Sequence, residues 1–357
     1  MCCCASKKTS KHAAVENDNA AAGISPMKKG IAFAGNLIVD QIKYIGRYPP
    51  PHTLATIRDT ALSTGGLACN CAMTMAKLDP SVPVQVLGIV GGDEMGEYIL
   101  RQFSAFPSID VSGILRMGST SYTDVMIDDD GGRTFFHYRG ANAQLTPDLI
   151  DLTALCADIL HIGYILLMDG LDAPDPEYET AMCRVLAKAR AAGIATSIDV
   201  VTEDGARFAK FVPPALAYTD YCIINEMEAE RTTEIPLRGE NGQIKMDNLR
   251  PACEKLIAMG VSRWAVIHMP ELSCGISKDG HYVQRDSWKI PKGFKKSSVG
   301  AGDAFAVGIL YGAYQGWSLD RSIETAGAIA AWSLSGPGAT DAVIPLPELM
   351  REMEKFQ

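Results

Sequence analysis

Apolar runs typical of β-strands recur along the chain, with helical stretches between them. The runs at 221–224 and 264–267 are apolar throughout, as expected of strands covered on both faces of a sheet. This alternation predicts a parallel sheet wound in βαβ units. We expect central strands at Ile31–Gly35, Val84–Val90, Ile159–Ile162, Ile194–Asp199, Tyr221–Asn225 and Trp264–His268, and helices at about 66–78, 94–104, 177–192, 249–259, 303–315 and 319–334.

Two segments break this alternation. Residues 41–64 contain three consecutive prolines followed by short Thr- and Ile-containing pieces, and residues 119–140 read as a hairpin of Ser121–Ile127 with Arg133–Arg139. Ligands of open α/β sheets bind at the carboxyl ends of the strands, so insertions that follow strands would border the ligand. The predicted fold is therefore α/β: a doubly wound, mostly parallel sheet with helices on both faces and a small β-sheet lid.

Composition narrows the class of protein. The 357 residues carry a formal net charge of −9, which argues against a nucleic-acid binder, and no apolar run approaches the roughly 18 residues of a membrane span. Residues 1–29 read as a polar, disordered tail before one domain at 30–357. Ten cysteines occur without a CxxC pair, which favours buried thiols in a cytoplasmic, reducing setting. The Cys2–Cys4 cluster is either an acylation site or without a role.

The segment Ser297–Phe305 carries the clearest chemistry. Gly300-Ala301-Gly302 leads into Asp303 and an apolar helical run. Residues with small side chains or none let backbone N–H groups approach an anion, and the helix directs its positive dipole end to the same place. With Asp303 as a proton acceptor, this is an arrangement suited to phosphoryl transfer to a hydroxyl. Taken alone, the motif also fits a plain helix start with a first-turn acid.

Two further patterns suggest contacts to a polyol. Gly65-Gly66 opens a helix and brings Asn70, a donor and an acceptor, close to a ligand. Asp40 follows the first strand, where a carboxylate can bind two vicinal hydroxyls. Singly, they are equally consistent with a Gly-rich turn and a solvated loop acid.

Asn225-Glu226-Met227-Glu228 lies at the end of a strand expected to be buried. Its amide and carboxylate oxygens suit a hydrated Mg²⁺, which keeps most of its waters and bridges to phosphates. A helix N-terminus with favourable acids is the other interpretation of this segment.

Together, these motifs resemble the PfkB (ribokinase-like) family of carbohydrate kinases over about residues 30–345. The segments that carry the resemblance are Gly65-Gly66-x-Ala68-x-Asn70-x-Ala72, Gly140-Ala141-Asn142-Ala143, Asn225-x-x-Glu228, Ser297 to Leu310 and Ser335-Gly336-Pro337-Gly338-Ala339.

The resemblance implies a role for each matching residue. Asp303 would deprotonate the acceptor hydroxyl, and the amides of Gly300, Ala301 and Gly302 would stabilise charge on the transferring phosphoryl group. Glu228, through water, and Asn225 would order Mg²⁺. The sugar would be held by Asp40, Gly65, Gly66, Asn70 and Asn142, and ATP would lie near Ser335, Gly336 and Gly338. Arg139 is a candidate contact to a substrate carboxylate or phosphate, or else a surface arginine at a strand end.

The chain departs from the family pattern at two places. Ser297 and Val299 stand where members commonly carry Asp and Thr. The resemblance therefore does not imply that this chain binds a monovalent cation. The nucleotide loop usually contains glycine, but here it reads His268-Met269-Pro270-Glu271-Leu272, and Pro270 fixes φ and lacks an N–H.

The predicted activity is ATP- and Mg²⁺-dependent phosphorylation of a hydroxyl on a sugar or sugar-like molecule. A nucleoside kinase of the same family and a catalytically silent sugar-binding protein are the alternatives. A dinucleotide oxidoreductase is excluded because the glycine loop lies late in the chain rather than after the first strand. The lid's exposed sheet edges make a homodimer plausible. Ribose, fructose, a keto-deoxy sugar acid and a nucleoside remain open as acceptors.

Overall fold

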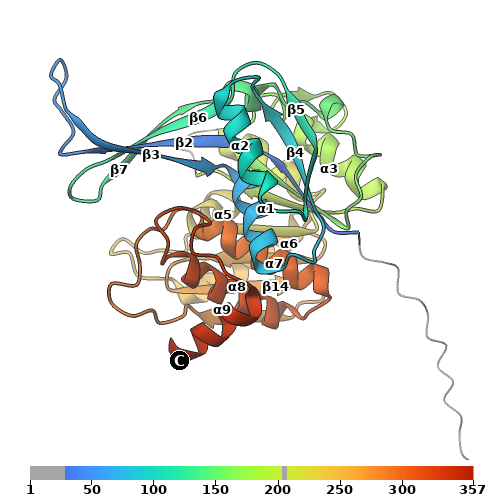
Figure 1. Ribbon diagram of the computed structural model, residues 1–357. Helices are drawn as coiled ribbons and strands as arrows, with labels where there is room; N and C mark the ends of the chain where they lie inside the picture. Colours follow the sequence, from blue (N-terminus) through green and yellow to red (C-terminus); the bar gives the residue numbers. More distant parts are fainter. Residues whose placement is uncertain (1–28, 203–206, 357) are drawn as a thin grey trace, which may run out of the picture.

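The computed structural model describes residues 29–202 and 207–356, so most of the predicted tail and Cys2–Cys4 lie outside the described residues. A nine-stranded sheet forms the centre of the molecule (Figure 1). Its order is β15-β14-β13-β12-β11-β8-β1-β4-β5, and neighbouring strands are parallel except that β14 pairs antiparallel with both β13 and β15. The strands are β1 (Ile31–Gly35), β4 (Val84–Val90), β5 (Ile109–Arg116), β8 (Ile159–Ile165), β11 (Ala195–Val200), β12 (Tyr221–Asn225), β13 (Trp264–His268), β14 (Leu272–Ser277) and β15 (Tyr282–Asp286).

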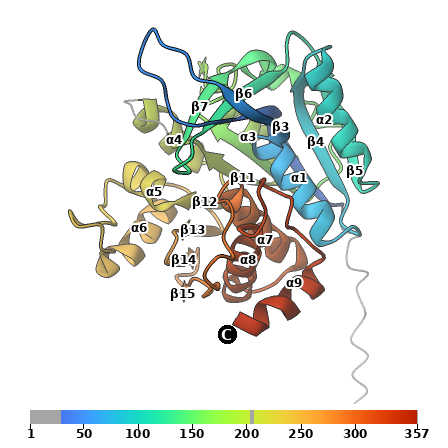
Figure 2. The ribbon, with the colours of Figure 1, turned by 60° about the vertical axis from the view of Figure 1, so that its left-hand side comes forward.

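Helices cover both faces of this sheet because successive strand residues point to opposite sides. Ile31 and Phe33 pack with α1, α2, α7, α8 and α9, whereas Ala32 and Ala34 pack with the cluster of α3, α4, α5 and α6. Figure 2 shows α1 beside α7, a contact on which the candidate site depends. The helices are α1 (Leu67–Leu78), α2 (Glu94–Ser104), α3 (Ala181–Ala191), α4 (Arg207–Leu216), α5 (Glu226–Thr233), α6 (Met246–Ala258), α7 (Ala301–Gln315), α8 (Leu319–Ser333) and α9 (Leu346–Met353).

The doubly wound fold is confirmed, and each of the six predicted strands is present with small differences at its ends. The expected helix at 177–192 begins later, because the Thr180 side chain accepts a hydrogen bond from Cys183 N and caps the helix at Ala181. The strands β5, β14 and β15 and the helices α4 and α9 were not predicted. In α4 the interior prolines Pro213 and Pro214 conceal the helical pattern.

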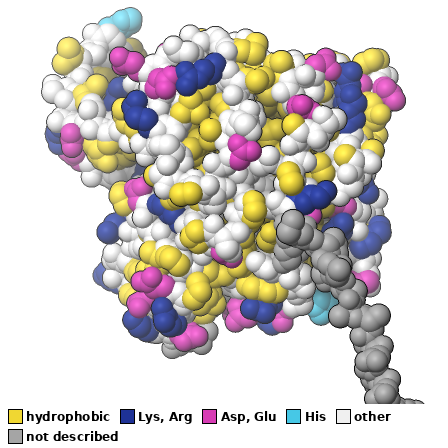
Figure 3. Space-filling view, turned by 45° about the vertical axis from the view of Figure 1, so that its right-hand side comes forward, with side chains coloured by type: hydrophobic (Ala, Val, Ile, Leu, Met, Phe, Trp, Pro, Cys, Tyr) yellow, Lys and Arg dark blue, Asp and Glu magenta, His cyan; other side chains and the backbone are white. Residues whose placement is uncertain are grey.

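A separate four-stranded sheet projects from the main body (Figure 1). Its order is β3-β2-β6-β7, formed by β2 (Ile38–Ile45), β3 (Ile57–Gly65), β6 (Ser121–Ile127) and β7 (Arg133–Tyr138). We call it the small sheet. The expected hairpin of β6 and β7 is confirmed. Figure 3 shows apolar side chains among charged ones on this projection. Asp40 is the third residue of β2, rather than part of a loop after the first strand as the sequence suggested.

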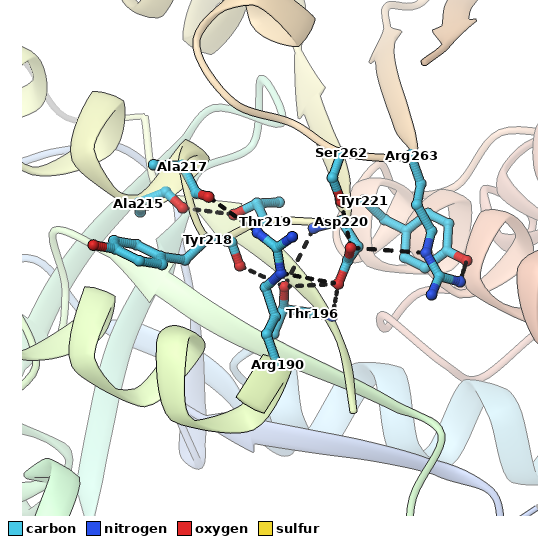
Figure 4. A network of polar contacts seen from close by, with 10 residues as sticks. All are labelled: Arg190, Thr196, Ala215, Ala217, Tyr218, Thr219, Asp220, Tyr221, Ser262 and Arg263. Carbon is cyan, nitrogen blue, oxygen red and sulfur yellow. Dashed lines mark hydrogen bonds and ion pairs between the residues drawn. The ribbon is translucent and has the colours of Figure 1, made fainter. Parts of the chain in front are cut away.

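A buried carboxylate ties together the amino ends of three central strands (Figure 4). Asp220, 6% exposed, accepts hydrogen bonds from Thr196 N at 2.8 Å and from the Ser262 hydroxyl. The guanidinium groups of Arg190 and Arg263 lie 3.9 and 3.7 Å from its oxygens. These groups belong to α3, to the starts of β11 and β12 and to the approach to β13. Asp220 therefore holds together the amino ends of these strands, at the end of the sheet opposite their carboxyl ends.

Two short strands and three 3₁₀ helices complete the described chain. Strands β9 (Pro174–Asp175) and β10 (Glu179–Thr180) pair ahead of α3, and the 3₁₀ helices are η1 (Gly140–Gln144), η2 (Pro147–Leu149) and η3 (Glu354–Phe356). Across residues 29–202 and 207–356, no helix combines the length and apolar character needed to span a membrane.

Candidate active site

Asp303 lies in the first turn of α7 and is 5% exposed. The helix begins after Gly300, whose φ of 75° favours glycine. A Cβ at this position would come within 2.4 Å of the Ala339 side chain, so the loop packs directly against the segment at 335–339. The first amides of α7 and the Asp303 carboxylate are thus placed together, which is the arrangement expected of an anion site with an adjacent base.

Two neutral donors hold the Asp303 carboxylate. Asn70 Nδ2 on α1 donates to Oδ2 at 2.8 Å, and the Tyr164 hydroxyl on β8 donates to Oδ1 at 2.8 Å. Burial raises the pKa of Asp303 to about 6, and the two hydrogen bonds oppose that rise. A carboxylate of this kind is ionised at neutral pH yet remains a competent proton acceptor.

Asp40 reaches the same region from the small sheet. Burial raises its pKa to about 6, a hydrogen bond from the Thr123 side chain lowers it, and the nearby Asp303 carboxylate raises it further. Thr123 lies opposite Asp40 in the pairing of β2 with β6. A Cβ at Gly65 would meet the Asp40 carboxylate at 2.5 Å, so glycine at this position leaves the carboxylate its space.

The turn at Gly66 places α1 against the end of β1. Gly66 has a φ of 82°, and a Cβ there would meet Asn36 O at 2.5 Å. The side chain of Asn36 accepts a hydrogen bond from Tyr164 N at 2.6 Å. Two buried polar atoms here lack a protein partner, Asn70 Oδ1 and Asn36 Nδ2. A buried acceptor beside Asp303 without a partner is a site where a ligand hydroxyl could donate.

Two carboxylates, those of Asp199 and Glu228, lie where β11 ends and α5 begins. Glu228 closes a capping box with Asn225: its carboxylate accepts from Asn225 N at 3.0 Å, and Asn225 Oδ1 accepts from Glu228 N at 3.0 Å. Burial raises the pKa of Glu228 to about 7. Burial, then Glu228 and Asp303, raise the pKa of Asp199 well above its usual range. This oxygen-rich, electrostatically unfavourable cluster fits a hard divalent cation held through water.

The segment at 335–339 follows α8 and lies beside the loop that precedes α7. Lys296 N and Ser297 N both donate to Leu334 O, at 2.7 and 3.2 Å. Within the segment the Ser335 hydroxyl donates to Trp332 O, and Gly338 N donates to the Asp341 carboxylate. A Cβ at Gly336 would come within 2.9 Å of Ala342 N, so this turn is tightly folded.

The unusual loop after β13 forms a short turn. Met269 N donates to Leu272 O at 3.0 Å and joins β13 to the antiparallel β14. The His268 ring stacks at a tilt on Phe305, with centroids 5.0 Å apart, and faces Gly302, where a Cβ would lie 3.5 Å from the ring. Burial lowers the pKa of His268 to about 4, so the ring is neutral at neutral pH.

The residues that depart from the family pattern make a specific contact. Ser297 is buried, and its hydroxyl accepts from Arg133 Nη1 and from Val299 N, each at 3.1 Å. Arg133 begins β7, so the small sheet touches the loop before α7 at this point.

Two residues expected at the substrate have protein partners in this structure. Asn142, fully buried in η1, donates through Nδ2 to Leu37 O and accepts from Leu37 N. Arg139 donates to Asp169 Oδ1 at 2.8 Å and to Leu166 O at 3.3 Å. Both side chains thus support the segments around the site. Asp40, Gly65, Asn70 and Asp303, in contrast, converge as the motifs suggested.

Sequence reasoning missed Tyr164, Asp199 and Arg133. Asp199 is the final residue of a predicted strand, and Tyr164 follows one by two positions. Their positions near the carboxyl ends of strands could have marked them as candidates, because ligands of open α/β sheets bind there. Nothing local in the sequence marks Arg133, whose partner is 164 positions away.

Comparison with known proteins identifies the family of this chain. The family model described as "pfkB family carbohydrate kinase" matches residues 28–346. An ATP-dependent ribose-1-phosphate kinase of Halopiger xanaduensis is 27% identical over 319 residues, covering 87% of this chain and 94% of that protein. A deoxyribokinase of Salmonella typhi is 24% identical, covering 90% and 97%.

Solved structures with the same fold include the ribokinase of Arabidopsis thaliana in complex with ribose and ATP. It has a TM-score of 0.76 and 20% identity, and the match covers 92% of this chain and 99% of that one. A nucleoside kinase of Methanocaldococcus jannaschii has a TM-score of 0.68 and 21% identity, covering 92% and 98%. On the strength of the family match, which spans most of the sequence, the chain belongs to the pfkB family of carbohydrate kinases.

Proposed function

We propose that this kinase transfers the γ-phosphoryl group of ATP to a hydroxyl on a sugar or sugar-like molecule, with Asp303 as the general base. The observation that carries the proposal is the buried Asp303 carboxylate in the first turn of α7, held by Asn70 and Tyr164 at 2.8 Å. Relatives named for ribose-1-phosphate, deoxyribose and ribose kinase activity favour a pentose or pentose phosphate as acceptor.

In the proposed reaction the acceptor hydroxyl donates its proton to Asp303 as its oxygen forms a bond to the γ-phosphorus. The bond from that phosphorus to the β,γ-bridging oxygen breaks, and ADP leaves. The N–H groups of Gly300, Ala301 and Gly302 at the start of α7 stabilise the charge on the transferring group. Asp40 and the unpartnered Asn70 Oδ1 accept hydrogen bonds from sugar hydroxyls and place the reacting one beside Asp303.

Mg²⁺ is proposed to bind near Glu228, Asn225 and Asp199, through water. The fit comes from the donor set, because all three residues offer oxygen and the two carboxylates repel each other until a cation balances them. When bound, the ion would neutralise charge on the ATP phosphates. We propose that ATP binds near Gly300 and the segment at 335–339, and the close packing of Gly300 against Ala339 supports this.

The test is ADP release from Mg-ATP with a panel of pentoses, pentose phosphates, hexoses, sugar acids and nucleosides. Asp303→Asn should reduce kcat by at least about 10³-fold while sugar binding changes little. Asp247→Asn, which alters the exposed first-turn acid of α6, is the matched control and should retain full turnover. Near-normal turnover of Asp303→Asn would exclude it as the base. A nucleoside as best acceptor would favour a nucleoside kinase, and binding without turnover a silent sugar-binding protein.

A further inference from the structure

Each oxygen of the Asp303 carboxylate has its own neutral donor. Tyr164 Oη lies 2.8 Å from Oδ1, and Asn70 Nδ2 lies 2.8 Å from Oδ2. The donors belong to different elements, β8 and α1, so the carboxylate cannot rotate about its Cβ–Cγ bond without breaking both hydrogen bonds. Each oxygen still keeps a lone pair with which to accept a proton.

We propose that Tyr164 is a positioning residue for phosphoryl transfer: its hydroxyl fixes the orientation of Asp303 and keeps it in the ionised, proton-accepting form. This inference rests on the proposed role of Asp303 as the base. Asn70 is expected to bind the sugar as well, whereas the two hydrogen bonds that Tyr164 donates, from its N–H to Asn36 and from its hydroxyl to Asp303, support the site itself.

The electrostatic surroundings explain why a donor is needed. In the described part of the chain, the Asp303 charge raises the pKa values of Asp40 on β2, Cys69 and Cys71 on α1, Tyr164 on β8 and Asp199 on β11, and none of these five groups is a cation. Burial, followed by the Asp303 and Asp199 charges, raises the pKa of Tyr164 far above its usual range, so its phenol remains a donor. The bonds from Asn70 and Tyr164 are what oppose protonation of the buried Asp303 carboxylate.

A matched pair of tyrosine variants separates this role from ordinary structural support. Tyr164→Phe removes the hydroxyl bonded to Asp303. Tyr311→Phe removes a similar hydrogen bond, which the Tyr311 hydroxyl donates to Asp79 at 2.9 Å. Tyr311 lies on α7, as Asp303 does, but its bond does not involve Asp303. Both variants lose one part-buried tyrosine–aspartate hydrogen bond, so both should melt at a lower temperature.

The decisive measurement is a pH titration of the Asp303 carboxylate. The titration is monitored by NMR on protein labelled with ¹³C at the aspartate carboxyl carbons. The signal missing from Asp303→Asn identifies the residue, which is essential because Asp40 also titrates near pH 6. In Tyr164→Phe the Asp303 midpoint should rise by about one pH unit, and in Tyr311→Phe it should not move. An unchanged midpoint in Tyr164→Phe, or equal rises in both variants, would overturn the proposal.

Kinetics provide the second readout. With a raised Asp303 midpoint, kcat/KM of Tyr164→Phe should fall about fivefold more at pH 6 than at pH 8.5, since more of the base is protonated at the lower pH. A decrease that is the same at both values would contradict the positioning role. The NMR result does not depend on turnover. A wrong kinase assignment would show itself separately, because the wild-type protein would then phosphorylate none of the acceptors.

Discussion

Arg133 and Ser297 form a hydrogen bond that connects the small sheet to the loop before α7. Arg133 Nη1 lies 3.1 Å from Ser297 Oγ, although the residues are 164 positions apart. The same hydroxyl accepts from Val299 N, immediately before Gly300. Because Asp40 is carried by the small sheet, this bond helps to set its position relative to Asp303.

Arg133→Ala should raise KM for the acceptor by about three- to tenfold with a smaller effect on kcat, since one hydrogen bond holding the small sheet is lost. Ser297→Ala should have a similar effect, and the double variant should be little worse than either single variant. Arg58→Ala removes an exposed small-sheet arginine paired with Asp129 and should leave KM unchanged. Independent, additive effects of the first two substitutions would show that the bond does not hold the sheet over the site.

The sequence allowed much of the fold and site to be predicted, for a physical reason. Central strands covered on both faces must be apolar throughout, so β12 and β13 could be recognised from composition. The glycine-rich turn before Asn70 and the loop before Asp303 are local patterns with a direct chemical consequence. Their convergence followed from the rule that the carboxyl ends of parallel strands form one edge.

The remaining features depend on contacts between distant segments. Asn142 looked like a sugar ligand, yet its amide pairs with the main chain of Leu37, 105 positions away. Tyr164 has no recognisable motif around it, and its importance comes only from its distance to Asp303. The strands β14 and β15 were missed because they form an antiparallel addition outside the βαβ repeat.

Asp199→Asn should make the protein more stable at pH 8. The folded-state pKa of Asp199 is raised, so the folded chain binds that proton more tightly than the unfolded chain, and the associated stability is lost as pH rises through the folded value. Asparagine cannot ionise and avoids this cost. We expect a Tm about 2–4 °C above wild type at pH 8, with the difference shrinking as the pH falls towards 5. Asp247→Asn, at an exposed site, should show no such trend; a constant difference for Asp199→Asn at both pH values would contradict the electrostatic explanation.

Asp220→Ala should destabilise the fold without altering the site directly. The substitution leaves Thr196 N and the Ser262 hydroxyl without their acceptor at the amino ends of the strands. We expect a loss of about 2–3 kcal/mol in the free energy of unfolding, measured by urea denaturation. At a temperature where both proteins are folded, KM for the acceptor should match wild type, and a large change in KM would show that this network reaches the site.

The register of the small sheet places three exposed apolar side chains close together on the face that does not carry Asp40. Leu62 and Phe136 flank Gln41 and Asp124 across the four strands, and Tyr138 lies two residues along β7 on the same side. These three side chains are 57, 56 and 47% exposed. Asp40 lies on the opposite face, because it is next to Gln41 in the strand and successive strand residues point to opposite faces. An apolar face of this kind on a projecting sheet favours association with a second copy of the chain.

Sedimentation velocity at micromolar concentration should therefore show a homodimer, and Phe136→Glu should shift it towards monomer because the variant places a charge in the apolar contact. Met227→Glu is the control, since Met227 is 48% exposed and belongs to α5 rather than to a strand of the small sheet. If the small sheet is the contact, the monomeric variant should also bind the acceptor more weakly, because Asp40 belongs to the same sheet. A wild-type monomer, or a dimer that Phe136→Glu leaves intact, would exclude this face as the interface.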